Sequence, residues 1–183
     1  MMELPAQILV GDHIALRALQ AGDAAKLFRL VDRNRARLKQ WLPWVDNTKT
    51  AEDTLRFIEK AQNDFKEKEA AAYGILFRGQ LAGVIGLHYI DWVNRKTGVG
   101  YWIAAEFSGR GIVVMSVRAL VEHLFKELKL NRVGILIEPG NVKSQAIAKK
   151  LGFTEEGRLR QYAKIYDRFA DHLVYSILAK EWK

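Results

Sequence analysis

Residues 98–121 read GVGYWIAAEFSGRGIVVMSVRALV, and this stretch predicts a strand, a short turn and a helix in direct succession. The strand is the apolar run at residues 98–104, and the turn is the more polar segment that follows it. The helix carries one apolar stripe, which consists of Val113, Val117, Leu120, Val121, Leu124 and Leu128. A strand that leads through a glycine turn into a buried helix is typical of α/β sheets.

The turn contains two glycines, Gly109 and Gly111, on either side of Arg110. Glycines allow the loop to curl and its N–H groups to approach a ligand, and the helix start behind them favours an anion such as pyrophosphate. The same spacing also occurs in ordinary turns. A dinucleotide fingerprint is excluded because Val114 stands where the third glycine is required. A P-loop is excluded because no Lys-Ser or Lys-Thr pair follows these glycines.

Further strands and helices are expected on both sides of this unit. Alternating or apolar runs predict strands at 13–19, 72–78, 81–90, 97–104, 132–137, 153–162 and 170–178. Helices are expected from residue 23, through residues 37–38, from 50 to 65 and from residue 143. No linker or repeat divides the chain, so we expect one domain over residues 1–183 with a mixed α/β sheet.

The composition is that of an ordinary globular protein, with 49% hydrophobic and 27% charged residues among 183. No signal peptide or membrane-spanning run is apparent, so we expect a cytoplasmic protein with no membrane contact. The absence of cysteine excludes a thiol nucleophile and thiolate metal sites. The net charge of +8 favours a polyanionic partner, namely a phosphorylated cofactor, nucleic acid or an acidic protein. Direct nucleic-acid binding is not expected, because no motif for it is present.

Several spaced segments together resemble the GNAT superfamily of acetyl-CoA-dependent N-acetyltransferases. Residues 106–111 (EFSGRG) are similar to the family's [Q/R]-x-x-G-x-[G/A] loop, although Glu106 departs from it. Residues 141–144 (NVKS) and 150–153 (KLGF) are similar to a later family segment. The segments WLPW (41–44), GLHYID (86–91) and GYW (100–102) look like the ribosomal-protein-serine acetyltransferase group. The resemblance extends from about residue 14 to residue 182.

The resemblance implies a fold and a cofactor site. The fold would be a mixed, mostly antiparallel sheet of about seven strands, with helices on both faces and a splayed central strand pair. Acetyl-CoA would be the co-substrate, and no metal is expected. A bulge near residues 101–103 would free a backbone N–H for the thioester oxygen. The residues implied to bind acetyl-CoA are Tyr101, Trp102, Ile103, Ser108, Gly109, Arg110, Gly111, Ile112, Asn141 and Ser144.

The resemblance also implies catalytic candidates. Ser144 would be the general acid that protonates the leaving thiolate, or else the N-cap of its helix. Ala148 stands where many relatives carry a tyrosine, and Ala163 where related enzymes carry a candidate basic glutamate. Asp91 and His88 are therefore alternative bases that would act through water. No base is required if the acceptor is an α-amine of low pKa.

The acceptor is expected to be the N-terminal α-amine of a protein, with an acidic ribosomal protein favoured. Candidate acceptor-binding residues are Trp41, Trp44, His88 and Trp92. Trp41 and Trp44 flank Pro43 and suit either a hydrophobic plug or a cleft wall. The alternatives are acetylation of a small-molecule amine and a non-catalytic acetyl-CoA sensor. A homodimer is expected because dimers are common among the relatives.

Overall fold

The computed structural model describes residues 3–183. Its strands are β1 (Gln7–Val10), β2 (Ile14–Ala18), β3 (Ala71–Phe77), β4 (Gln80–Asp91), β5 (Lys96–Ile103), β6 (Arg132–Ile137), β7 (Thr154–Ile165) and β8 (Arg168–Leu178). Its α-helices are α1 (Ala24–Arg33), α2 (Arg35–Leu38), α3 (Ala51–Glu67), α4 (Ile112–Lys126) and α5 (Val142–Lys150). The strand, turn and helix predicted at residues 98–121 are thus β5, the glycine loop and α4.

The strands form one sheet in the order β1-β2-β3-β4-β5-β6-β8-β7. Every neighbouring pair is antiparallel except β5 and β6, which are parallel. The expected mixed, mostly antiparallel sheet is confirmed, but it has eight strands in the described residues rather than about seven. The additional strand is β1, which pairs with β2 from Gln7↔Arg17 to Val10↔Ile14. Only Val10 of its four residues is buried, so the sequence pattern there was too weak to predict it.

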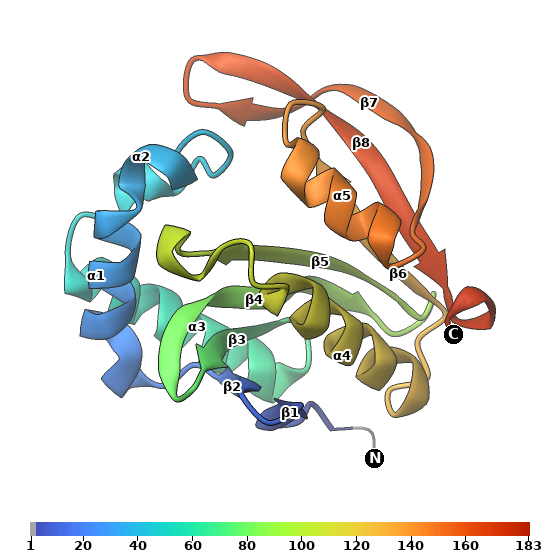
Figure 1. Cartoon of the computed structure of the whole chain (residues 1–183), viewed down its shortest axis with the longest axis horizontal. Coiled ribbons are helices and arrows are strands. Elements are labelled where there is room, and N and C mark those ends of the chain that lie inside the picture. Colours follow the sequence, from blue (N-terminus) through green and yellow to red (C-terminus); the bar gives the residue numbers. More distant parts are fainter. Residues whose placement is uncertain (1–2) are drawn as a thin grey trace.

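Helices cover both faces of the sheet, as expected (Figure 1). On one face, Val117, Leu120 and Val121 of α4 pack in the main core with Tyr73 and Ile85 of the sheet. On the other face, Leu27 of α1 and Ile58 of α3 pack around Val84. Because side chains alternate along a strand, Tyr101 of β5 faces the α4 side and Trp102 faces the α1 side.

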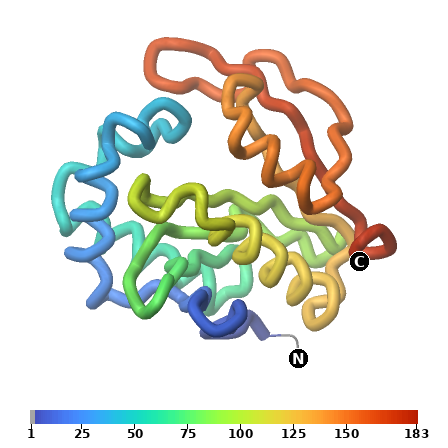
Figure 2. Tube along the Cα trace, in the orientation of Figure 1, coloured from blue at the N-terminus to red at the C-terminus, as the bar shows by residue number. Residues whose placement is uncertain are grey.

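The sheet is splayed between β5 and β6, as the resemblance implied. The two strands pair only from Lys96↔Arg132 to Gly98↔Gly134. Beyond that point β6 continues along β8 while β5 continues along β4, and the chain traces diverge (Figure 2). The peptide groups of β5 that face β6 therefore lack a strand partner from Val99 onward.

The predicted position of the bulge was wrong. Tyr101, Trp102 and Ile103 pair in regular register with Ile85, Val84 and Gly83. The irregularity lies in β4, where Leu87 pairs with Val99 but Ile90 pairs with Thr97. One extra residue is thus inserted at His88–Tyr89, opposite Gly98. The free edge of β5 results from the divergence of β6 and not from a bulge in β5.

No helix in residues 3–183 is both long and apolar enough to cross a membrane.

Candidate active site

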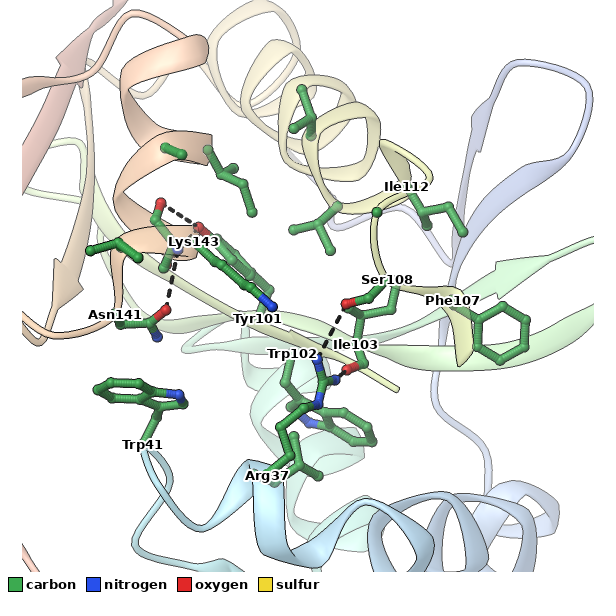
Figure 3. Close-up of a pocket in the computed structure, with 18 of the residues that line it drawn as sticks. Arg37, Trp41, Tyr101, Trp102, Ile103, Phe107, Ser108, Ile112, Asn141 and Lys143 are labelled. Carbon is green, nitrogen blue, oxygen red and sulfur yellow. Dashed lines mark hydrogen bonds between the residues drawn. The ribbon is translucent and has the colours of Figure 1, made fainter. Parts of the chain in front are cut away.

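A cavity of about 760 Å³ opens where β5 and β6 diverge (Figure 3). Its walls are the end of β5, the glycine loop with the first turn of α4, the start of α5, and the segment from α2 to Leu42. Ligand sites of small molecules and cofactors fall in this range of volume. The site is therefore built from four parts of the chain that the sheet topology brings together.

The edge of β5 presents unpaired peptide groups to this cavity. The N–H of Ala104 donates to the carbonyl of Ala82 in β4 at 2.8 Å. Because peptide direction alternates in an antiparallel ladder, the backbone N–H and C=O of Trp102 also point toward β4. Those of Tyr101 and Ile103 point the other way, toward the cavity. The carbonyl of Ile103 indeed accepts a hydrogen bond from the cavity side, from Arg37. The exposed N–H groups of Tyr101 and Ile103 are thus available to a ligand.

The glycine loop gives the cavity a second set of backbone donors. Gly109 and Gly111 adopt φ of +78° and +74°, a conformation that disfavours other residues. Gly111 is the N-cap of α4, and the first helical hydrogen bond runs from the N–H of Met115 to its carbonyl. The N–H groups of the first turn and the positive end of the dipole therefore suit an anion. Ser108 and Ile112 line the cavity with the two glycines.

Arg110 does not line the cavity. Its side chain is directed elsewhere, with the guanidinium 5.9 Å from the ring centre of Phe77. Glu106 does not line the cavity either, and so sets no carboxylate beside the anion site. The departure from the family pattern at residue 106 is consistent with a loop that works through its backbone.

The hydroxyl groups of Tyr101 and Ser144 lie 2.9 Å apart inside the cavity, and either can donate to the other. Burial raises the pKa of Tyr101 to about 12, although the hydrogen bond with Ser144 acts in the opposite direction. The phenol is therefore protonated at physiological pH. Asn141 is the N-cap of α5, and its Oδ1 accepts from the N–H of Ser144 at 3.2 Å. The alternative in which Ser144 caps the helix is wrong.

Arg37 was missed as a site residue. It reaches from α2 to the cavity side of β5, where it donates to the carbonyl of Ile103 and to Oγ of Ser108 at 3.2 Å (Figure 3). Its Nε is buried with no partner among residues 3–183. In the sequence, Arg37 is one of four basic residues in the run 33–39 (RNRARLK), and nothing in that run distinguishes it from the other three. A contact between α2 and β5 is set by tertiary structure and leaves no local pattern.

The two tryptophans of the WLPW segment lie in different environments. Trp41 lines the cavity, and its ring is so close to Gly140 that a Cβ there would lie 3.3 Å from it. Trp44 packs on Trp102 instead, with ring centres 6.3 Å apart. The cleft interpretation therefore fits Trp41, and Trp44 belongs to a second, smaller hollow.

The structure does not bring His88, Asp91 or Trp92 to the cavity. The ring of His88 lies against Gly100, where a Cβ would be 2.3 Å from Nε2, and desolvation lowers its pKa. Asp91 accepts hydrogen bonds from Asn94 in the β4–β5 turn, and these bonds lower the pKa of its carboxyl. Trp92 donates to the carbonyl of Lys68 at 2.8 Å. The positions of His88, Asp91 and Trp92 outside the cavity support structural roles for these residues.

The lining of the cavity contains no aspartate, glutamate or histidine. Ala163 pairs with Ala170 in the β7–β8 hairpin and adds no carboxylate. Within the described part of the chain, no three His, Asp or Glu side chains are grouped to hold a metal ion. The site thus offers backbone donors, two linked hydroxyls, a guanidinium and the side chain of Lys143, but no carboxylate or imidazole base.

The far side of the cavity is bounded by contacts between the segment 40–42 and the β7–β8 hairpin. The hydroxyl of Tyr166 donates to the carbonyl of Leu42 at 3.1 Å. Arg168 forms an ion pair with the buried Glu138 at 2.7 Å and also donates to the carbonyl of Gln40. The β7–β8 hairpin thus holds the segment that carries Trp41 (Figure 2).

Comparisons with known proteins agree with this geometry. Residues 13–154 match the Acetyltransferase (GNAT) domain family. The chain is 40% identical over 176 residues to YdaF of Bacillus subtilis (strain 168), provisionally named a ribosomal N-acetyltransferase, covering 95% of this chain and 96% of YdaF. It is 27% identical to the ribosomal-protein-serine acetyltransferase of Escherichia coli (strain K12), covering 92% of this chain and 94% of that enzyme.

A solved structure of RimL, a ribosomal L7/L12 α-N-protein acetyltransferase in complex with coenzyme A, superposes with a TM-score of 0.91. It is 28% identical, and the match covers 94% of this chain and 97% of RimL. The microcin C7 self-immunity acetyltransferase MccE, in complex with acetyl-CoA and AMP, gives the same TM-score and identity, with 96% of this chain and 97% of MccE covered. Sequence, fold and site agree, and the chain belongs to the GNAT family of acetyltransferases.

Proposed function

We propose that this enzyme transfers the acetyl group of acetyl-CoA to an amine by direct attack, without a covalent enzyme intermediate. The observation that carries the proposal is the free edge of β5 beside the glycine loop, because one provides strand-like pairing and the other an anion site. Acetyl-CoA can use both features, because the amides of its arm can pair with a strand edge and its pyrophosphate is an anion. The solved neighbours RimL and MccE are complexes with coenzyme A and acetyl-CoA.

The residues of the cavity fit the chemistry of a thioester. Acetyl-CoA supplies an activated carbonyl, and the N–H of Tyr101 or Ile103 can donate to its oxygen as negative charge develops. One such donor lowers the activation free energy by about 3 kcal/mol. The hydroxyl of Ser144, linked to that of Tyr101, can donate a proton to the departing sulfur. Asn141 holds the backbone of Ser144 in place as the helix cap.

The proposed acceptor is the N-terminal α-amine of a ribosomal protein. The relatives named above include enzymes for ribosomal-protein serine and for L7/L12. A cavity lined by no carboxylate or histidine suits an amine with a substantial neutral fraction near pH 8, as α-amines have. The net charge of +8 favours an acidic protein over a polycationic small amine. We further propose a cytoplasmic homodimer by resemblance, which light scattering would test.

The test is mass spectrometry of ribosomal proteins incubated with the enzyme and acetyl-CoA. The proposal expects a gain of one acetyl group at the N-terminus of one or few proteins. Acetylation of small amines alone would favour the second acceptor class. Binding of acetyl-CoA without turnover on either panel would favour a non-catalytic sensor and would refute the proposed activity.

A further inference from the structure

A second hollow, of about 90 Å³, lies behind Trp102 on the α1 side of the sheet. Most of its lining is apolar and comes from α1, α3, β4, β5 and the segment after α2, through Leu27, Val31, Phe57, Val84, Trp102 and Trp44; Thr48 and Thr54 complete it. Phe57 and Trp44 are half-exposed and form its mouth. A hollow of this volume has room for several water molecules, or for a group of roughly four to six heavy atoms.

Thr54 indicates that the hollow takes a ligand. Its side chain lines the hollow from α3 and is only 3% exposed, yet its Oγ1 has no hydrogen-bond partner in the described residues. A buried hydroxyl without a partner is unfavourable and uncommon in native proteins. A ligand group with a polar atom near its end would satisfy it. No charged side chain lines the hollow, so a charged ligand group is disfavoured.

The hollow adjoins the acceptor side of the active site, because two parts of the chain border both. Trp102 lines the main cavity, where Figure 3 labels it, and also lines the hollow. The WLPW segment places Trp41 in the cavity and Trp44 at the hollow, three residues further on. An acceptor whose amine enters the cavity from the α2 side would therefore have its next residues close to the hollow, since an extended chain advances about 3.3 Å per residue.

We propose that this hollow is a specificity pocket for an uncharged, mainly apolar side chain from the second or third residue of the acceptor. The inference rests on the proposed function, because it assumes a peptide acceptor with a free amine. It adds that the enzyme selects among N-terminal sequences by side-chain size and charge.

The experiment measures kcat and KM for synthetic peptides with a free N-terminal serine and with Gly, Leu, Thr or Asp at position two or three. At one of these positions, Thr should lower the acceptor KM at least about tenfold relative to Gly, because its hydroxyl can pair with that of Thr54, whereas Leu should lower it less and Asp should not. Phe57→Ala, which opens the mouth, should abolish this preference and leave the KM for acetyl-CoA unchanged. Thr54→Val should remove any preference for Thr over Gly.

Phe65→Ala is the matched control, because it is the same substitution on the same helix at a residue that does not line the hollow. It should lower the melting temperature without changing the ratio of KM values. Acetylation of all peptides with equal KM, or a preference that survives Phe57→Ala, would overturn the pocket but not the proposed function. Acetylation of no peptide at all would overturn both.

Discussion

Tyr101 and Ser144 form the one pair of linked hydroxyls among the residues that line the cavity. Ser144→Ala should lower kcat by about 10²-fold or more, because a general acid acts only as the thiolate departs. The KM for acetyl-CoA should change little. Steady-state kinetics and a thermal melt are sufficient as measurements. Since Asn141 and not Ser144 caps α5, the melt should be nearly unchanged.

Tyr101→Phe tests the same pair from the other side. It keeps the ring on the α4 face and removes only the hydroxyl that contacts Ser144. A loss of kcat similar to that of Ser144→Ala, with no further loss in the double variant, would show that the two hydroxyls act as a unit. A full rate in both single variants would refute proton donation from this pair.

The absence of a base from the cavity lining predicts the pH dependence. With no carboxylate or histidine to take a proton, the acceptor amine must arrive neutral. The value of kcat/KM should therefore rise with pH and level off above the pKa of the amine, about 7.7–8.0 for an α-amine. Tyr101, with a pKa of about 12, stays protonated across this range and adds no falling limb. An apparent pKa that is the same for all acceptors would instead indicate an enzyme group such as His88, whose pKa is lowered by desolvation.

At the scale of elements, the glycine loop and α4 give a prediction with a close control. Gly111→Asp should sharply weaken acetyl-CoA binding, because it adds a carboxylate where backbone donors favour an anion. Gly79→Asp, in the β3–β4 turn, is its match, because both glycines have φ near +75° and open space for a Cβ. Each variant should lose about 1–2 kcal/mol of stability from the left-handed backbone. Equal acetyl-CoA affinity in the two variants, by calorimetry, would refute the anion site at the glycine loop.

Elements with strong local patterns were predictable from sequence, and contacts between elements were not. The apolar stripe of α4 and the apolar runs that form β3 and β4 are local, and the structure confirms these elements. The splay was implied by the family resemblance and not by any pattern in β5. The position of the bulge, the Tyr101–Ser144 contact and the reach of Arg37 depend on how strands diverge and helices pack. Such features have no periodic signature in the chain.

At the scale of the whole molecule, the active site is closed by contacts between distant parts of the chain. The N-terminal segment 37–42 supplies one wall of the cavity, and the C-terminal β7–β8 hairpin holds that segment through Tyr166 and Arg168. Arg168 is the central contact, because it also pairs with Glu138, whose side chain is 8% exposed. Acceptor binding should therefore depend on a residue that does not itself line the cavity.

Arg168→Met keeps the length of the side chain and removes the guanidinium. It should raise the acceptor KM severalfold and leave the KM for acetyl-CoA unchanged, because Trp41 loses its support while the glycine loop does not. Stability should fall by about 1–3 kcal/mol, since Glu138 is left buried without its charged partner. Arg158→Met is the control on the same hairpin, because it breaks the exposed pair with Asp171 and should cost little stability. If both variants raised the acceptor KM equally, the hairpin as a whole would be responsible and the specific role of Arg168 would be wrong.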